Sequence, residues 1–173
     1  MKTFIIAATT ADGFIGRDAG HLADWTGNAD KKLFVKLTKE AGVVIMGSRT
    51  FKTIGRALPG RRTIVYTHHP KEITAEGVET TSEKPAQLVD RLKSEGANGV
   101  AICGGASIYK LFMEAGVVDE LYITVIGKLF GTGVPLFGET LDVNLMLLET
   151  EKLNDKSVLL HYKVQTTSNE SYL

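Results

Sequence analysis

The sequence is poor in cysteine and tryptophan, with one of each among 173 residues. The single cysteine, Cys103, excludes an internal disulfide and a metal site built from several thiolates. The chain also lacks an excess of charge of either sign, because 20 Lys and Arg balance 20 Asp and Glu. No global field therefore attracts nucleic acid or anionic lipid, and we expect neither as a partner.

Long hydrophobic runs are missing as well. The apolar start, residues 1–8, is soon interrupted by Asp12, Arg17 and Asp18, a pattern that fits neither a signal peptide nor a membrane span. With 43% hydrophobic and 23% charged residues, the composition is typical of a folded globular protein. We expect one cytoplasmic domain over residues 1–165 and a polar, flexible tail over residues 166–173.

The sequence does contain short apolar runs, and these alternate with amphipathic segments. The runs are rich in β-branched residues and have the length of strands, and they cover residues 3–8, 43–46, 63–67, 100–103, 121–125 and 158–164. The amphipathic segments predict helices over residues 30–40, 85–95 and 107–115. This alternation predicts an α/β fold with a mainly parallel central sheet, in which the last run forms an antiparallel edge strand.

Asp30 stands at the start of the first predicted helix, and its position leaves two interpretations open. It is either a cap or solvated first-turn charge, or a carboxylate that lies beside Phe34 one turn later. In an apolar cleft, such a carboxylate can bind an amidine-like heterocycle through paired charge-assisted hydrogen bonds. Burial would raise its pKa and suit it to assist proton transfer.

Two glycine-bearing turns connect predicted strands to predicted helices. Gly104-Gly105 leads into Ala106-Ser107, and Gly47 leads into Ser48-Arg49-Thr50. Glycine lets a ligand approach the backbone, and a helix N-terminus offers N–H groups to phosphate. Each turn also fits an ordinary tight connection, and the spacing is not the GxGxxG of a Rossmann dinucleotide site.

The remaining candidate residues carry less specific signals. His68-His69 has no cluster of carboxylates or cysteines near it in sequence, so we interpret the pair as loop histidines and expect no metal. Arg61 follows a Pro-Gly turn and is either solvated or the bidentate partner of a substrate carboxylate. Cys103 lies in an apolar strand, which favours a core or pocket-wall position over a nucleophile. Trp25 either packs in the core or closes a loop over the site.

Taken together, these segments resemble dihydrofolate reductase. The resemblance rests on Met46-Gly47-Ser48-Arg49-Thr50-Phe51, Ile54-Gly55-Arg56-Ala57-Leu58-Pro59-Gly60-Arg61, Gly104-Gly105-Ala106-Ser107-Ile108-Tyr109 and Leu121-Tyr122-Ile123-Thr124, and it covers most of the chain up to residue 137. It implies a single-domain, three-layer dihydrofolate-reductase-like fold with eight strands in the sheet. It also implies NADPH-dependent reduction of 7,8-dihydrofolate to 5,6,7,8-tetrahydrofolate, by hydride transfer to C6 with protonation of N5.

The resemblance further implies a role for individual positions of this chain. It makes Asp30 the acid that holds the pterin, with Trp25 at a mobile loop and Thr124 linked to the acid. The implied substrate-binding residues are Ile6, Ala8, Asp30, Phe34, Ile54, Leu58, Arg61, Cys103 and Thr124, with Arg61 gripping the glutamate tail. The implied NADPH-binding residues are Ala8, Ile15, Gly16, Gly47, Ser48, Arg49, Thr50, Thr67, His68, Cys103, Gly104, Gly105, Ala106, Ser107, Ile108 and Tyr109. A monomer is the first expectation and a homodimer the alternative.

Some segments depart from this family. Residues 23–25 read Ala-Asp-Trp instead of Leu-Pro-Trp, and Asn28 replaces a common proline. The segments Asp12-Gly13-Phe14-Ile15 and Gly131-Thr132-Gly133-Val134-Pro135-Leu136-Phe137 instead resemble the related NADPH-dependent reductase of riboflavin synthesis, which reduces a ribosylaminopyrimidine phosphate. That reaction is the alternative function, and a folate- or nucleotide-binding protein without catalysis is a third. The choice between NADPH and NADH stays open.

Overall fold

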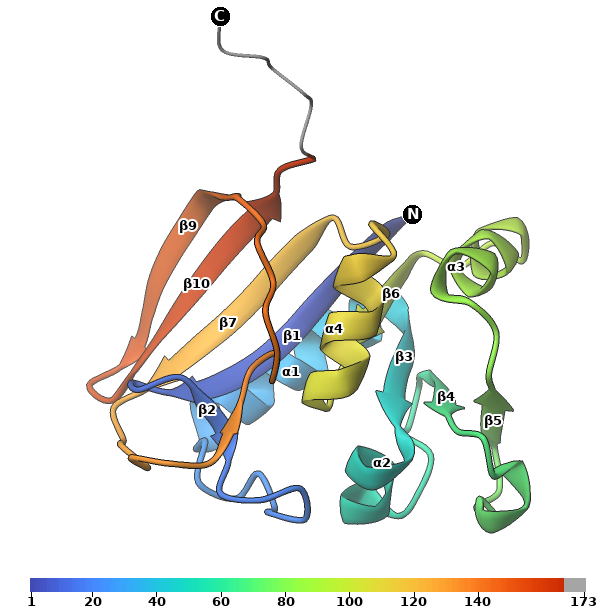
Figure 1. The fold of residues 1–173 in the computed structure, drawn as a ribbon, viewed down its shortest axis with the longest axis horizontal. Helices are drawn as coiled ribbons and strands as arrows, with labels where there is room; N and C mark the ends of the chain where they lie inside the picture. The colour runs from blue at the N-terminus through green and yellow to red at the C-terminus, as the bar shows by residue number, and fades with distance from the viewer. Residues whose placement is uncertain (167–173) are drawn as a thin grey trace, which may run out of the picture.

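The structure is a computed structural model, and it describes residues 1–166. Its central sheet contains β1 (Lys2–Thr10), β3 (Gly42–Gly47), β4 (Arg62–Tyr66), β5 (Val78–Thr81), β6 (Gly99–Ile102), β7 (Glu120–Ile126), β9 (Leu145–Asn154) and β10 (Ser157–Val164). The strands lie in the order β5-β4-β3-β6-β1-β7-β10-β9 (Figure 1). All pairs from β5 to β7 are parallel, whereas β10 runs antiparallel to both β7 and β9. The mainly parallel sheet with an antiparallel C-terminal edge is therefore confirmed.

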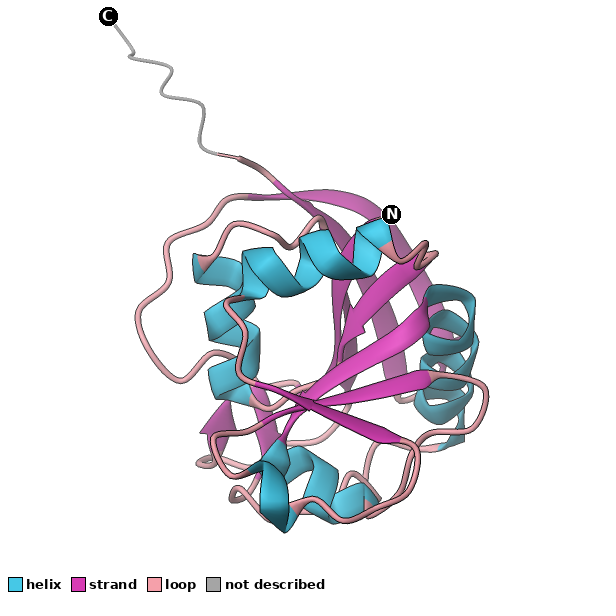
Figure 2. Ribbon diagram, turned by 90° about the vertical axis from the view of Figure 1, so that its right-hand side faces the viewer, coloured by secondary structure: helices cyan, strands magenta, loops and turns pink. Residues whose placement is uncertain are grey.

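Helices cover both faces of this sheet, which gives the three layers seen in Figure 2. They are α1 (Asn28–Ala41), α2 (Ser48–Ile54), α3 (Pro85–Ser94) and α4 (Ala106–Glu114), with a short 3₁₀ turn, η1, at Pro70–Glu72. Side chains of α1 and α2 pack against Val44 and Met46 of β3, and side chains of α3 and α4 pack on the cluster that includes Val43 and Ile45. Because successive strand residues face opposite sides, a strand covered on both faces reads as an uninterrupted apolar run.

The ends of the helices follow from local residue chemistry. Helix α1 stops at Gly42, which adopts φ 81° and donates its N–H to the Thr38 carbonyl. This left-handed conformation carries little cost for glycine and ends the helix directly before β3. Helix α3 begins at Pro85, where the fixed φ of proline suits the first turn and its missing N–H is not needed.

Several strands escaped the sequence prediction because they lack two buried faces. They are β5, β9 and the pair β2 (Phe14–Gly16) and β8 (Val134–Pro135), which forms a separate two-stranded sheet. Strand β10 has the predicted antiparallel direction, but its predicted position at the edge is wrong because β9 covers it. The domain boundary at residue 165 stays a prediction, and the predicted tail beyond residue 166 lies outside the described residues.

No helix within residues 1–166 is both long enough and apolar enough to cross a membrane.

Candidate functional site

A cleft of about 1060 Å³ opens beyond the carboxyl ends of β3, β4 and β6 and beside β1. In an open α/β sheet this is the side on which ligands bind. Its volume matches the upper end of ordinary ligand sites, about 1,000 Å³, which leaves room for two ligands in contact. The sequence-predicted residues that line it are Ile6, Ala8, Ile15, Gly16, Trp25, Asp30, Phe34, Gly47, Ser48, Arg49, Thr50, Thr67, His68, Cys103, Gly104, Gly105, Ala106, Ser107, Ile108 and Tyr109.

Four predicted residues do not line the cleft: Ile54, Leu58, Arg61 and Thr124. Ile54 and Leu58 pack, with Phe34, against the apolar cluster beneath α1 and α2. Thr124 is buried in β7, where only 1% of its surface is exposed.

Arg61 is held against α1 by a chain of hydrogen bonds. Its Nη1 donates to the Thr38 hydroxyl at 2.9 Å, and that hydroxyl donates to the Phe34 carbonyl at 2.6 Å. Its Nε donates to the Pro59 carbonyl at 3.0 Å. The guanidinium therefore lies one helical turn beyond Phe34, along the direction in which α1 leaves the cleft.

Asp30 lies at the floor of the cleft in the first turn of α1, and it caps no helix because Gly27 occupies the cap position. Burial raises the pKa of the Asp30 carboxyl above its ordinary value, while the hydroxyls of Thr26 and Thr124 act in the opposite direction. Both threonines are buried. A carboxylate that is partly desolvated and flanked by hydroxyls can accept two hydrogen bonds from a ligand, and it keeps its proton to higher pH than an ordinary aspartic acid does.

Trp25 lines the same cleft and carries a hydrogen-bond donor that has no partner among the described residues. Its Nε1 is buried and has no partner among residues 1–166. A buried indole N–H ordinarily has a partner, so this one calls for a ligand or water acceptor.

The segment that carries Trp25 packs on one aromatic ring from a distant loop. The centroid of the Phe130 ring lies 5.0 Å from the ring centroid of Trp25 and 5.6 Å from that of His21. The Arg17 guanidinium lies over the same Phe130 ring, 4.4 Å from its centroid. Asp12 fixes the backbone of that loop, because its carboxylate accepts N–H groups from Phe130 at 3.2 Å and Gly131 at 2.7 Å. The loop over Asp30 is thus shaped by contacts from another part of the chain.

The two glycine turns meet directly. The Gly47 N–H donates to the Gly104 carbonyl at 2.8 Å, and the peptide bond between Gly104 and Gly105 is cis. A Cβ on Gly47 would lie 3.0 Å from Cγ1 of Ile108, and one on Gly104 would lie 3.2 Å from the Tyr109 hydroxyl. That hydroxyl is fixed by donating to the Ile6 carbonyl at 2.8 Å. Side chains at these glycines would crowd Ile108 and Tyr109, so the close packing of the two turns against α4 requires glycine.

Two helices point their N-termini at the cleft. Helix α2 starts at Ser48 and α4 at Ala106, and neither has a side-chain cap on its N–H groups. Free N–H groups and the positive end of the helix dipole form a site for phosphate. The cationic side chains of Arg49 and Lys84 line the same cleft.

The sequence prediction missed Thr26, Ser82 and Lys84 at this site. For Lys84 a signal existed, because a cation at the start of a helix is unfavourable next to the dipole and therefore suggests another role. Thr26 and Ser82 lie in polar connections with no local pattern, so only the fold places them here.

Two predictions concern what the site does not contain. Burial raises the pKa of the Cys103 thiol to about 12, which keeps it protonated and agrees with a wall position rather than a nucleophile. His68 and His69 belong to no group of three or more metal-ligating side chains within residues 1–166.

Residues 2–167 match the family model described as dihydrofolate reductase. Dihydrofolate reductase type 3 of Salmonella typhimurium is 38% identical over 126 residues, which cover 73% of this chain and 72% of that relative.

Solved structures show the same fold. A putative riboflavin biosynthesis protein from Shewanella sp. PV-4 has a TM-score of 0.80 at 22% identity, over 96% of this chain and 100% of that one. Dihydrofolate reductase from Enterococcus faecalis, complexed with NADP(H), has a TM-score of 0.73 at 26% identity, over 95% and 97% of the two chains.

Proposed function

The chain belongs to the dihydrofolate reductase family, and from this premise we propose that it reduces 7,8-dihydrofolate to 5,6,7,8-tetrahydrofolate with NADPH. Membership makes it an oxidoreductase of the dihydrofolate-reductase-like superfamily. The finer assignment depends on the cleft, in which one end suits a heterocycle and the other suits phosphates.

The observation that carries the proposal is the environment of Asp30. A pterin presents a ring N–H and an amino group side by side, and a carboxylate accepts both in a bidentate pair. The raised pKa of Asp30 keeps a proton available nearer to neutral pH than an ordinary aspartic acid would. Asp30 would therefore orient the pterin ring and favour the protonation of N5, with Phe34 as the apolar wall beside it.

The other end of the cleft fits a dinucleotide phosphate. The uncapped N-termini of α2 and α4 and the bare backbone of Gly104 and Gly105 suit the pyrophosphate. Arg49 and Lys84 supply positive charge for a 2′-phosphate, which favours NADPH over NADH. NADPH supplies the hydride that C6 receives, and the chain holds the two rings together and excludes water.

Trp25 would contact both the bound substrate and the loop that contains Phe130. Its unpartnered Nε1 can donate to a polar atom of a bound heterocycle or to a bridging water. Its ring packs on Phe130, so the same side chain ties the bound substrate to the loop that covers it.

A second candidate is the reduction of a ribosylaminopyrimidine phosphate. The two segments that resemble the riboflavin-pathway reductase pair with each other as β2 and β8, beside the cleft. The likeness to the Shewanella sp. PV-4 structure agrees with this fold but, at 22% identity, does not choose a substrate.

One spectrophotometric assay separates the possibilities. NADPH oxidation is measured with dihydrofolate and, separately, with the ribosylaminopyrimidine phosphate, each repeated with NADH. We expect turnover with dihydrofolate and NADPH. Turnover with the pyrimidine alone would assign the second function, and ligand binding without NADPH oxidation under either condition would leave only a binding protein.

A further inference from the structure

Strand β9 forms an exposed edge on the side of the sheet far from the cleft. Nine of its ten residues are exposed, and Leu153 is the one half-buried position. It begins with four consecutive large apolar residues, Leu145, Met146, Leu147 and Leu148, which are between 37% and 52% exposed. An edge strand of this length with apolar side chains is a site at which another chain readily pairs.

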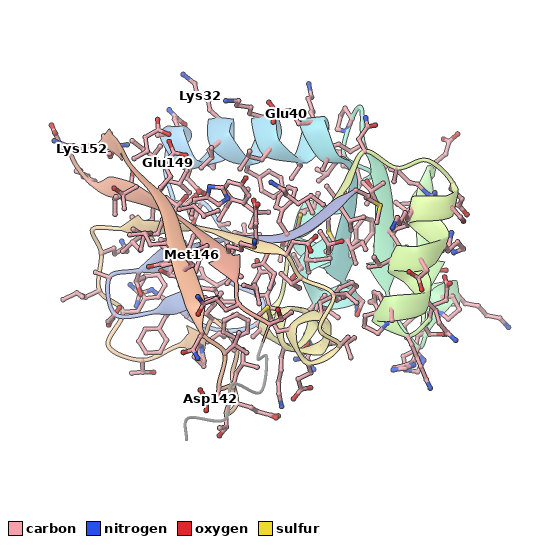
Figure 3. The ribbon with its side chains drawn as sticks, turned by 90° about the horizontal axis from the view of Figure 1, so that it is seen from above. Lys32, Glu40, Asp142, Met146, Glu149 and Lys152 are labelled. Carbon is pink, nitrogen blue, oxygen red and sulfur yellow. The ribbon has the colours of Figure 1, made fainter. Side chains whose placement is uncertain are left out.

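The exposed side of α1 lies beside this strand. Val35, on that side of the helix, is 40% exposed, and Asn28, Lys31, Lys32, Val35 and Lys36 surround a shallow hollow. Figure 3 shows Lys32 and Glu40 along α1, with β9 running towards the helix at Glu149 and Lys152 and past Met146. The register places Met146, Glu149 and Glu151 on the side of the sheet that α1 covers, and Leu145 and Leu147 on the opposite side. We call the surface formed by Lys32, Val35, Lys36, Met146, Glu149 and Glu151 the α1–β9 face.

Opposite charges occupy the two parts of this face. Glu149 pairs in register with His161, which in turn pairs with Tyr122 of β7. Glu151 pairs with Leu159, which pairs with Thr124. Tyr122 and Thr124 lie on the side of the sheet that α1 covers, so both glutamates face that side. Lys32 and Lys36 point away from the core on α1. No ion pair within residues 1–166 involves either these two lysines or these two glutamates.

We propose that the α1–β9 face joins two copies of this chain into a twofold-symmetric dimer, in which α1 of each copy lies against β9 of the other. An isologous contact requires a surface that complements itself, and a basic element next to an acidic one around apolar residues meets this requirement. A nucleic acid or an anionic membrane would be repelled by Glu149 and Glu151. The proposal takes the second of the two oligomeric states that the sequence left open.

The α1–β9 face extends along residues 146–151 of β9, about 20 Å of strand, and along about one turn of α1. The charges at its rim are exposed, so salt should weaken the contact.

The test uses charge reversal in two separate variants of the full chain. Sedimentation velocity and native mass spectrometry should show the wild type as a dimer at micromolar concentration. The β9 variant (Glu149→Lys with Glu151→Lys) and the α1 variant (Lys32→Glu with Lys36→Glu) should each weaken the dimer at least tenfold, because each places like charges together. Mixing the two variants should restore a dimer that contains one copy of each.

A matched apolar pair controls for surface charge in general. Met146→Lys, at a methionine that is 44% exposed, should weaken the dimer, whereas Leu129→Lys, at a leucine that is 71% exposed and lies outside the face, should leave it unchanged. Circular dichroism checks that every variant is folded. A monomeric wild type, a dimer that survives both charge reversals, or a mixture that forms no mixed dimer would overturn the proposal.

Discussion

The substitution Asp30→Asn tests the central residue of the cleft through both activity and stability. Asn keeps one acceptor oxygen but replaces the other with an amino group, which faces a pterin donor instead of accepting from it. A hydrogen bond to a charged group contributes about 1.5–3 kcal/mol, and an unpaired buried donor adds a further cost. We therefore expect a loss of about 2–4 kcal/mol in transition-state binding, or roughly 30- to 900-fold in kcat/KM.

The stability of the unliganded protein should change in the opposite direction. Because burial raises the pKa of Asp30, the folded state holds this proton over a pH range in which the unfolded chain has released it. The contribution of Asp30 to stability therefore falls as pH rises from the ordinary aspartate value of 3.8 through the raised folded-state pKa. Asp30→Asn should be more stable than the wild type at neutral pH, by about 1.4 kcal/mol for each unit of the rise.

Two measurements check this reasoning. Steady-state NADPH oxidation with dihydrofolate is followed from acidic to alkaline pH, and urea unfolding of the unliganded chain is followed over the same range. The activity loss of the variant should shrink at acidic pH, where the substrate arrives already protonated, and the stability gain should vanish below pH 3.8. Asp24→Asn, at an exposed acid in the loop that precedes α1, is the control. Wild-type turnover across pH, or a variant no more stable than wild type at neutral pH, would refute the assignment.

Three further predictions concern Arg61 and two residues that line the cleft, Lys84 and Gly47. Arg61→Ala should weaken dihydrofolate binding by about 2–5 kcal/mol if its contact is desolvated, with no effect on a pterin that lacks the glutamate tail; titration of both ligands checks this. Lys84→Gln should raise the KM for NADPH about fivefold and leave the KM for NADH unchanged, since an exposed charge pair contributes up to about 1 kcal/mol. Gly47→Ala should lower the melting temperature and raise the KM for NADPH, because its Cβ would lie 3.0 Å from Cγ1 of Ile108. Adding Ile108→Ala to that chain removes the crowded atom and should recover part of the loss; equal losses in the single and double variants would contradict the contact.

The sequence predicted the interior of the fold better than its margins. Strands β1, β3 and β6 are buried on both faces, so their apolar runs stand out from the flanking residues. Strand β9 is exposed along nearly its whole length, and its residues follow no buried-and-exposed alternation that would mark it as a strand. Because the sequence does not mark β9 as a strand, it predicts β10 at the edge of the sheet, a position that β9 occupies.

Some residues of the site could likewise be predicted from local sequence patterns, and others could not. Gly47 and Gly104 were recognisable because each leaves an apolar strand for a helix, and the phosphate-binding chemistry of that junction is local. Thr26 and Ser82 come from connections whose position depends on the packing of distant elements. The contact between Phe130 and Trp25 joins residues more than a hundred positions apart, and no local pattern in either segment predicts it.

That contact makes the loop above Asp30 a composite of two segments. Asp12 holds the backbone at Phe130 and Gly131, and Phe130 holds the side chains of Arg17 and Trp25. A chimera that took residues 17–27 from a relative would set a foreign loop on the native aromatic ring. The unit that can be exchanged between relatives is therefore discontinuous in sequence. Residues 17–27 have to be exchanged together with the segment around Phe130, because the conformation of each depends on contacts with the other.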